Sequence, residues 1–354
     1  MMELTLQNNG SNGLIYWMLI GQIGGVVCWI GPDGTATPIA IGDDCALYQS
    51  PINAGEAAVV PVSGDIASAR VSFCAGQPLQ IAIVADGNGN PSVQDAVFWL
   101  PTDANYDVVW DKAEFTVAGG QIWANTTQVD FFGMGMTISI TDGTTLLVGP
   151  SLAISPAQLY ANFSAAGSPW SDLVVGTARI ISPGYGQSFP SDYLSAYIDS
   201  CWMRLTSAHP LSLSLKGATA GYTSAHGSVN ASGTLVMKDN LGGLYHVHKP
   251  SSSDVFLCNG ALSIDGSLSP VEQQVDGIIK RQIGAGLNRG VLIDKDRCGS
   301  MHFYKAPLTN TYSKLMHSAY TGHLCYGFAY DDVCNLYSST LSINNVTAMA
   351  IVVD

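Results

Sequence analysis

The feature that most limits the fold of this chain is the alternation of short β-branched or aromatic runs with glycine-rich turns over residues 1–150. Clear turn signals occur at residues 31–34, 86–91, 119–120 and 141–143. Strand-length runs punctuated about every 8–12 residues predict a β-sandwich or a β-barrel. The composition agrees, because 38 glycines and only 12% charged residues do not suit a coiled coil, a helical bundle or a disordered chain.

The pattern changes near residue 151. Apolar residues recur at helical spacing over residues 191–204 and 270–287, which predicts helices there. The tail over residues 341–353 is again rich in β-forming residues. We therefore expect a mainly β protein with a β-sandwich or barrel domain over residues 1–150, to which residues 335–354 return, and a mixed α/β domain over residues 151–334.

The formal net charge of −13 limits the partners of the chain. A negative field repels phosphate backbones and anionic lipid, so neither nucleic acid nor a membrane is expected to bind, whereas a neutral sugar polymer is not penalised. The most apolar stretch, residues 14–30, is broken by glycines and predicts two strands around a turn rather than a membrane helix. The start of this chain has no recognisable secretory signal.

The eight cysteines are scattered and form no CxxC pair. Such a pattern favours some disulfides and an extracellular, oxidising location over a zinc site. Cys325 and Cys334, nine residues apart, are the candidate local bridge, and buried free thiols are the alternative for each cysteine. His246 and His248 would share one side of a strand, but no third ligand is identifiable, so we expect no metal and no cofactor.

The segment over residues 106–130 carries the groups most suited to chemistry. Gly119 and Gly120 can form a two-residue hairpin turn, which places Glu114 opposite Asn125 and Thr116 opposite Trp123. Because side chains alternate, one face of this hairpin is apolar. The other face holds a carboxylate, an indole, an amide and hydroxyls from Glu114, Thr116, Trp123, Asn125 and Thr127. These groups can bind and cleave a sugar, although an ordinary solvated sheet face is the alternative.

Asp130 has the opposite parity in this register, so a regular strand would point it into the core. An unpaired buried carboxylate is costly, which predicts a bulge or bend between Thr126 and Val129 that redirects the side chain. A three-residue turn over residues 118–120 would instead bring Asp130 onto the Glu114 face directly. That register leaves Ile122 beside Glu114, so we prefer the two-residue turn; either way the two carboxylates could straddle one groove.

The pattern of Glu114, Phe115 and Thr116 followed by residues 123–130 (WANTTQVD) resembles the β-1,3-glucanases of glycoside hydrolase family 64, which have a thaumatin-like fold. Glu114 and Asp130 are separated by a spacing that fits the family. Residues 14–34, 287–290 and 303–333 contain further similar stretches. The resemblance is discontinuous but spans most of the chain.

The resemblance implies an inverting hydrolase of β-1,3-glucan that releases short oligosaccharides, with Glu114 as the general acid and Asp130 as the general base. Their carboxyl groups should then lie about 6.5–9.5 Å apart, which leaves room for a water. It also implies a groove between the β domain and the mixed domain that holds the glucan. The substrate-binding candidates are Thr116, Trp123, Asn125 and Thr127 on the hairpin, and Asp103, Tyr304, His317 and Asp332 elsewhere. We expect a monomeric extracellular enzyme.

Two other functions remain to be weighed. A thaumatin-like glucan-binding or antifungal protein could keep the groove without turnover, but the presence of both Glu114 and Asp130 disfavours it. A structural or adhesive β protein would account for the low content of charged residues and the many glycines. It would not account for the grouping of Glu114, Trp123, Asn125 and Asp130. Individual candidates also have structural interpretations, since Asp331 and Asp332 could form a turn or cap and His317 could be a buried structural histidine.

Overall fold

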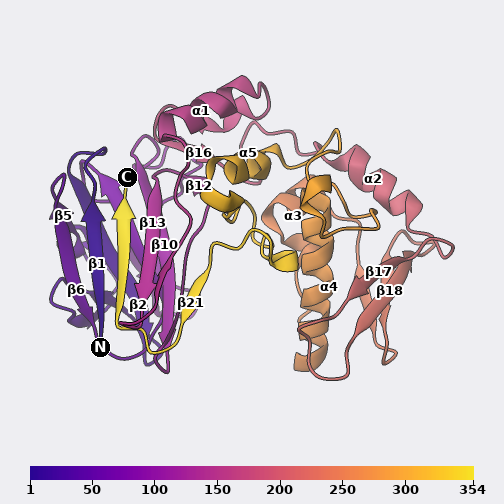
Figure 1. The fold of residues 1–354 in the computed structure, drawn as a ribbon, viewed down its shortest axis with the longest axis horizontal. Coiled ribbons are helices and arrows are strands. Elements are labelled where there is room, and N and C mark those ends of the chain that lie inside the picture. The colour runs from indigo at the N-terminus through magenta and orange to yellow at the C-terminus, as the bar shows by residue number, and fades with distance from the viewer.

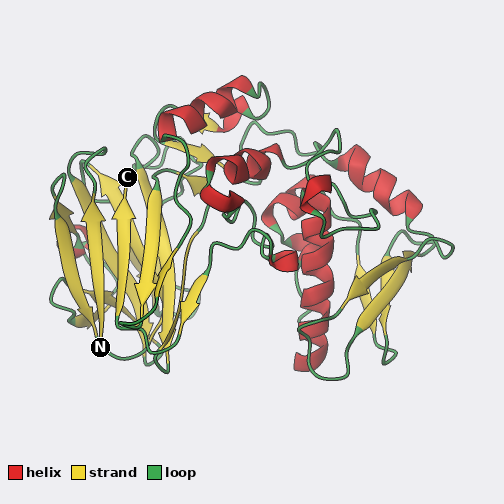
Figure 2. Ribbon diagram, in the orientation of Figure 1, coloured by secondary structure: helices red, strands yellow, loops and turns green.

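The computed structural model describes residues 1–354 and has a mainly β fold, as the sequence predicts. Figure 1 shows a strand-rich body that contains both chain termini, a second body built around a long helix and a small sheet, and short helices and strands between them. Figure 2 shows that the helices are confined to the connecting region and the second body, apart from a short turn beside the sandwich.

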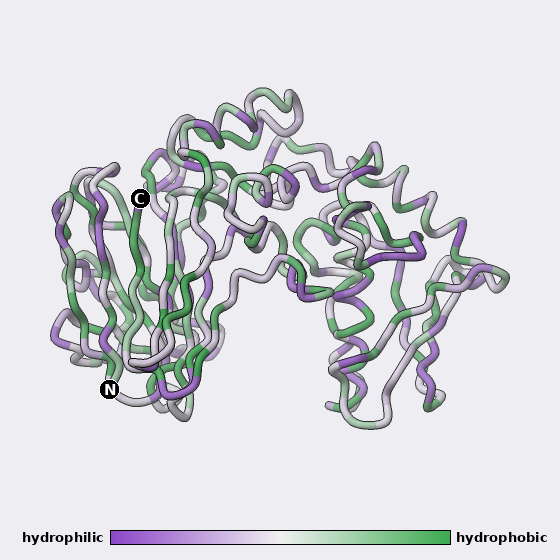
Figure 3. Tube along the Cα trace, in the orientation of Figure 1, coloured by the Kyte–Doolittle hydropathy of each residue, from purple (hydrophilic) through white to green (hydrophobic).

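The first sheet of the strand-rich body contains both ends of the chain. Its strands run in the order β14 (Leu146–Val148), β13 (Met136–Thr141), β22 (Ala348–Val353), β1 (Met2–Asn8) and β6 (Ala57–Val62). β22 pairs in parallel with β1 and antiparallel with β13, so the C-terminal strand occupies the middle of the sheet. β22 is hydrophobic along its length (Figure 3), and its side chains alternate between fully buried and half-buried positions, so neither face is open to solvent.

The second sheet carries the hairpin of interest. Its strands run in the order β21 (Leu341–Ile343), β11 (Gln121–Thr126), β10 (Trp110–Ala118), β7 (Ile66–Ala75), β2 (Ile15–Ile23), β3 (Val26–Ile30) and β4 (Ala36–Pro38), with β5 (Ser50–Ile52) paired to β2. The predicted strands around the Gly24–Gly25 turn are confirmed, since β2 and β3 pair with Ile23 opposite Val26. Glycine suits this turn because both residues have positive φ angles, 58° and 82°.

The two sheets enclose one apolar core. Leu4, Ile138 and Ile351 enter it from the first sheet, and Phe73 and Phe115 enter it from the second. All five side chains are at most 3% exposed. The opposite face of the second sheet is partly covered by another apolar cluster, which includes Met18, Ile20 and Trp110, and its polar part lies over β10 and β11.

The second body has its own core, which is assembled from helices and a small sheet. The helices are α1 (Pro156–Ala165), α2 (Ser195–Arg204), α3 (Ser252–Leu257), α4 (Pro270–Asn288) and α5 (Thr311–Ala319). The small sheet consists of β17 (Leu211–Ser214), β18 (Ser224–Val229), β19 (Leu235–Asp239) and β20 (Leu244–Val247). The predicted helices over residues 191–204 and 270–287 are confirmed as α2 and α4, although α2 begins at Ser195.

α4 follows directly from its sequence. Ser269 caps its N-terminus and forms a reciprocal capping box with Glu272, and Pro270 occupies the first turn. Val275, Ile279 and Ile283 then recur on one buried face. The burial of that face fixes α4 against the core of the second body.

Short strands and 3₁₀ turns make up the rest of the fold, in the connecting region and in the loops of the two bodies. The three-stranded sheet has the order β12 (Phe131–Phe132), β16 (Arg179–Ile181) and β15 (Val174–Val175), and β8 (Ala82–Ala85) pairs with β9 (Pro91–Gln94). Six 3₁₀ turns complete the fold: η1 (Cys45–Tyr48), η2 (Ser171–Leu173), η3 (Gly260–Leu262), η4 (Ser300–His302), η5 (Thr321–His323) and η6 (Val333–Asn335). None of the helices has the length and apolar character needed to cross a bilayer.

The predicted bridge between Cys325 and Cys334 is wrong. Cys334 forms a disulfide with Cys298, and the other six cysteines are free and buried. The reason is orientation, since the Cys325 sulfur lies 3.5 Å from Nδ1 of His317 in the interior, whereas Cys334 lies in η6 beside Cys298. Proximity in sequence therefore did not identify the pair.

Candidate active site

The hairpin of β10 and β11 has the predicted two-residue turn. Ala118 pairs with Gln121, Thr116 with Trp123 and Glu114 with Asn125. Gly119 and Gly120 supply the two positive φ angles that the turn requires, 57° and 81°. Phe115 and Val117 are buried in the core, so the Glu114 side of β10 faces away from it.

A groove of about 550 Å³ lies over this polar face. Four of the predicted hairpin residues line it together: Glu114, Thr116, Trp123 and Asn125. Glu114 is half-buried, and Trp123 is 40% exposed, which is unusual for so large an apolar side chain. The groove therefore offers a flat aromatic surface beside a carboxylate.

Two further charged residues that line the groove, Arg70 and Asp95, were not predicted from the sequence. Arg70 on β7 lies directly across from Glu114 in the sheet, and its guanidinium forms a two-point ion pair with Asp95. Both residues line the groove. No local signal could identify them, because the pairing of β7 with β10 is a long-range contact.

Thr116 is held by a bulge in the neighbouring strand. The register of β10 against β7 shifts between Phe115 and Val117, and the displaced Ser68 has a φ of 50°. The Ser68 backbone N–H donates to Oγ1 of Thr116 at 3.1 Å. The Thr116 hydroxyl can still donate its own proton into the groove.

Asp130 lies beyond the end of β11, in an irregular segment over residues 127–130 that agrees with the predicted bend. Oδ2 of Asp130 lies 2.7 Å from Nζ of Lys112, with both side chains largely buried. Lys112 precedes Glu114 by two residues on β10, so the two share one face of the strand. The bend therefore turns the Asp130 carboxylate toward the Glu114 side of the sheet.

Tyr185 is a further neighbour of Asp130. Burial raises the pKa of the Tyr185 hydroxyl to about 12, and the nearby Asp130 carboxylate adds to the shift. Tyr185 also stacks on Trp99, with ring centroids 4.7 Å apart. The phenol therefore stays protonated and belongs to an aromatic wall beside the carboxylate.

Two of the predicted binding residues, Thr127 and Asp103, form hydrogen bonds to the backbone of their own loops. Thr127 is 9% exposed, does not line the groove, and accepts the Val129 N–H with its hydroxyl. Asp103 accepts the backbone N–H groups of Val97 and Asn105 and organises its own loop.

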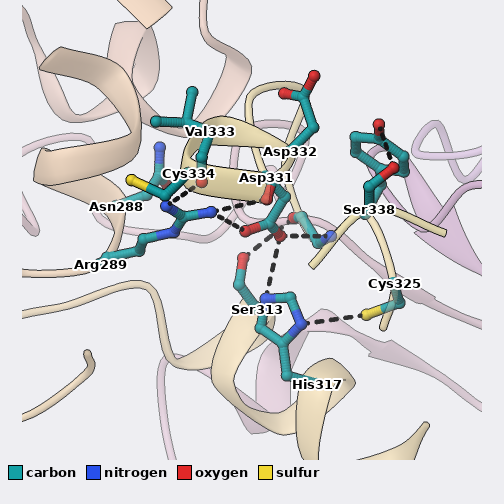
Figure 4. Close-up of polar contacts among 12 residues, drawn as sticks. Asn288, Arg289, Ser313, His317, Cys325, Asp331, Asp332, Val333, Cys334 and Ser338 are labelled. Atoms are coloured by element: carbon teal, nitrogen blue, oxygen red, sulfur yellow. Dashed lines mark hydrogen bonds and ion pairs between the residues drawn. The ribbon is translucent and has the colours of Figure 1, made fainter. Parts of the chain in front are cut away.

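Tyr304 and His317 are only 8% and 4% exposed, so the structure does not bring them to the groove. His317 belongs to the buried cluster in Figure 4, where Nε2 lies 3.0 Å from Oδ2 of Asp331 without hydrogen-bond alignment. Arg289 contacts the other Asp331 oxygen at 3.2 Å. His317 therefore has the surroundings of a buried structural histidine, the alternative that the sequence left open.

Asp332 also lies apart from the hairpin. Its carboxylate pairs with Arg281 of α4 and lines a separate pocket near the Cys298–Cys334 disulfide. His246 and His248 have no third metal-ligating side chain grouped with them. Of the ten predicted site residues, the structure brings Glu114, Thr116, Trp123 and Asn125 together in the hairpin groove, and Asp130 lies outside its lining.

The structure is a β-sandwich whose polar face carries a carboxylate and an exposed indole, with a second carboxylate redirected beside them, and these are groups able to contact a sugar. Over residues 1–353 the chain matches the model of glycoside hydrolase family 64, described as β-1,3-glucanase. The chain belongs to this family.

Individual relatives are distant in sequence. A glucan endo-1,3-β-glucosidase of Cellulosimicrobium cellulans is 26% identical over 93% of this chain, which spans 61% of the length of that relative. The β-1,3-glucanase domain from Clostridium beijerinckii is 24% identical with a TM-score of 0.83, covering 99% of this chain and 97% of the other.

A laminaripentaose-producing β-1,3-glucanase, solved in complex with laminaritetraose, is also 24% identical. The comparison covers 100% of this chain and 98% of that one, with a TM-score of 0.86. These structures share the fold of the present chain.

Proposed function

We propose that this chain is an endo-acting β-1,3-glucanase that hydrolyses β-1,3-glucan with inversion and releases short laminari-oligosaccharides. The observation that carries the proposal is the groove over β10 and β11, in which Glu114 lies beside Trp123 while Lys112 holds Asp130 on the same side of the sheet. The family to which the chain belongs, and the names of its relatives, support the same activity.

Glu114 is the proposed general acid. Its carboxyl has no ion-pair partner, because the adjacent Arg70 is engaged by Asp95. A carboxyl in this position can donate its proton to the glycosidic oxygen as the bond to the leaving sugar breaks. The half-buried setting beside an indole limits the access of water to that proton.

Asp130 is the proposed general base. As a carboxylate it removes a proton from a water, which attacks the anomeric carbon from the face opposite the leaving group. The reaction then exchanges the β-glycosidic bond for an α-hemiacetal. Lys112 keeps the carboxylate oriented through the 2.7 Å ion pair.

The groove offers the contacts that a glucan chain needs. The indole of Trp123 can stack on the apolar face of a glucose ring, and Thr116 and Asn125 can hydrogen-bond to its hydroxyls. The ion pair of Arg70 and Asp95 adds charged donors and acceptors to the groove lining. No phosphate or lipid is required, in keeping with the net charge of −13.

We further propose a thaumatin-like β-sandwich domain over residues 1–150 and 335–354 and a mixed domain over residues 151–334. The two largest apolar cores support this division: one draws on residues such as Leu4 and Ile351, the other on residues such as Leu159 and Ile283. A third, smaller cluster joins the two parts and includes both Trp110 and Ile181. The groove over β10 and β11 is lined by residues of the first domain alone, and the glucan would extend from it toward the second domain. The proposed enzyme is a monomer that acts outside the cell, and its disulfide is compatible with that location.

The test is the release of reducing sugar from laminarin and curdlan by the purified chain and by Glu114→Gln and Asp130→Asn. Wild type should release oligosaccharides, and each variant should lose about 100-fold or more of the activity. Glu56→Gln, an exposed substitution near β6, is the matched control and should retain full activity. Binding to insoluble curdlan, measured by pull-down, should persist in all four proteins. Binding without release by wild type would instead identify a glucan-binding protein.

A further inference from the structure

The bend that carries Asp130 is held by residues from distant parts of the chain. At its start, the Ser339 hydroxyl donates to the Thr126 carbonyl at 2.8 Å. At its end, the Asp130 carbonyl accepts the N–H of Ser182 at 2.9 Å. Regular sheet hydrogen bonds are absent between these points, so other contacts must define the conformation of residues 127–130.

The peptide groups of Gln128 supply those contacts. The Gln128 N–H donates to the carbonyl of Tyr326 at 3.0 Å, and the Gln128 carbonyl accepts the hydroxyl proton of Tyr312 at 2.6 Å. Gln128 is 1% exposed and Tyr312 is fully buried, so water does not compete for either bond. The two successive peptide groups on either side of the Gln128 Cα, two residues before Asp130, are therefore each held by a residue from the C-terminal part of the chain.

Tyr312 is itself firmly placed. It lies in the first turn of α5, where the Asn310 side chain accepts the Ser313 N–H and donates to Asn288. Its ring contacts Phe163 edge-on, with centroids 5.6 Å apart. Burial raises the pKa of the Tyr312 hydroxyl well above its usual value, so the hydroxyl remains a donor.

The second partner, Tyr326, is fixed by the buried cluster of Figure 4. The neighbouring Gly327 donates its N–H to Asp331 at 2.9 Å and accepts the Ser313 hydroxyl proton at 3.1 Å. A Cβ at Gly327 would lie 2.8 Å from the Ser313 side chain, so no larger residue fits this approach. Asp331 is in turn held by Arg289. The cluster thus anchors the carbonyl that receives the Gln128 N–H.

We propose that Tyr312 is a positioning residue for Asp130, acting through the Gln128 carbonyl to set the direction in which the carboxylate leaves the bend. The inference rests on the proposed function, because it assigns Tyr312 a role in the geometry of the general base. Loss of the Tyr312 hydroxyl leaves a buried carbonyl without its donor, and the bend relaxes. The glucan-binding residues of β10 and β11 lie outside this bend and keep their positions.

The variant is Tyr312→Phe, which removes one oxygen and keeps the ring. Small misplacements of a catalytic group cost up to about 100-fold in rate, so kcat should fall about 10- to 100-fold while KM stays within about twofold. Tyr320→Phe is the matched control, because the Tyr320 hydroxyl is buried near the end of α5 without a hydrogen-bond partner. This control should leave both constants unchanged. Unchanged kcat in Tyr312→Phe, with the control normal, overturns the inference.

A double-mutant cycle separates positioning from a general structural effect. In the Asp130→Asn background, adding Tyr312→Phe should change the small residual rate by less than about twofold, because the group that it positions is already gone. An equal loss in both backgrounds means that Tyr312 acts elsewhere, and the inference fails while the proposed function stands. Full activity of Asp130→Asn alone would overturn both.

A second variant keeps the test valid if Tyr312→Phe does not fold. Ser339→Ala removes the donor to the Thr126 carbonyl, at the other end of the same bend. It should lower kcat with KM preserved, and this loss should also disappear in the Asp130→Asn background. A Ser339→Ala protein with normal kcat, or with a loss that persists beside Asp130→Asn, overturns the inference that the held bend sets the base.

Discussion

The ammonium nitrogen of Lys112 lies 2.7 Å from a carboxylate oxygen of Asp130, although a complete hairpin separates the two residues in the chain. Lys112 shares its strand face with Glu114, so the ion pair ties the irregular segment to the strand that bears the other carboxylate. The ion pair therefore fixes the position of the Asp130 carboxylate, although residues 127–130 do not belong to a regular strand.

Replacement of Lys112 tests how much the ion pair with Asp130 contributes to catalysis. Lys112→Met removes the positive charge and keeps much of the side-chain length, so the Asp130 carboxylate should lose its orientation. We expect kcat on laminarin to fall about tenfold, since catalytic efficiency depends strongly on geometry. Lys112→Arg, which keeps the charge, should retain more activity. Steady-state rates of the two variants check the expectation, and equal rates in both would contradict it.

Trp123 is expected to act on binding rather than on chemistry. Trp123→Ala removes the exposed aromatic surface and should raise KM about tenfold, which corresponds to a loss of about 1.4 kcal/mol of binding free energy. kcat should change little, because the indole contacts the bound sugar in both the ground and transition states. Met203 on α2, which is 74% exposed and lies outside the groove, offers a control as Met203→Ala. A fall in kcat with unchanged KM would assign Trp123 a different role.

Asp111 gives the protein a specific pH dependence. It is fully buried, accepts the N–H groups of Gly133 and Met134, and burial raises its pKa to about 6. Because this pKa exceeds the unfolded value of about 3.9, the folded state binds the proton more tightly. The stability due to the proton is therefore fully present below pH 4 and is lost as the pH rises to 6.

The measurement is urea unfolding of wild type and Asp111→Asn at pH 4.5 and pH 7. Relative to Asp111→Asn, wild type should gain about 2 kcal/mol of unfolding free energy on going from pH 7 to pH 4.5. Asp107→Asn, on the neighbouring exposed loop, is the control. A difference between wild type and Asp111→Asn that does not change with pH would show that Asp111 does not titrate in this range.

The Cys298–Cys334 disulfide should contribute to stability and not to catalysis. It closes a long loop, with a sequence separation of 36, and its removal in Cys298→Ser/Cys334→Ser should cost about 4 kcal/mol in the chain-entropy model. Unfolding by urea measures this loss, and laminarin hydrolysis below the unfolding range should be unchanged. Dithiothreitol should destabilise wild type only. If it destabilised the double variant equally, the stabilisation would have another source.

The local parts of the structure follow from the sequence. The Gly119–Gly120 turn sets the register of β10 and β11, and Ser269, Pro270 and Glu272 define the start of α4. The bend before Asp130 was also predictable, because the parity of the strand would otherwise bury a carboxylate. These features depend on neighbours within one element or one hairpin.

The rest depends on contacts between distant segments. Arg70 faces Glu114 only because β7 pairs with β10, and Tyr312 reaches Gln128 across 184 residues. Tyr304 and His317 lie in the interior, and Cys334 meets Cys298 rather than Cys325, because packing of the C-terminal loops decides which side chains face inward. Neither periodicity nor local spacing carries that information.

The anomeric configuration of the first product tests the central proposal most directly. Wild-type protein is mixed with a linear β-1,3-glucan, and proton NMR follows the newly formed reducing ends before mutarotation equilibrates them. We predict that α-anomers appear first, because water activated by Asp130 attacks opposite the bond that Glu114 protonates. Initial release of β-anomers, or no release from a folded protein, would contradict the assignment of Glu114 and Asp130 as an inverting pair.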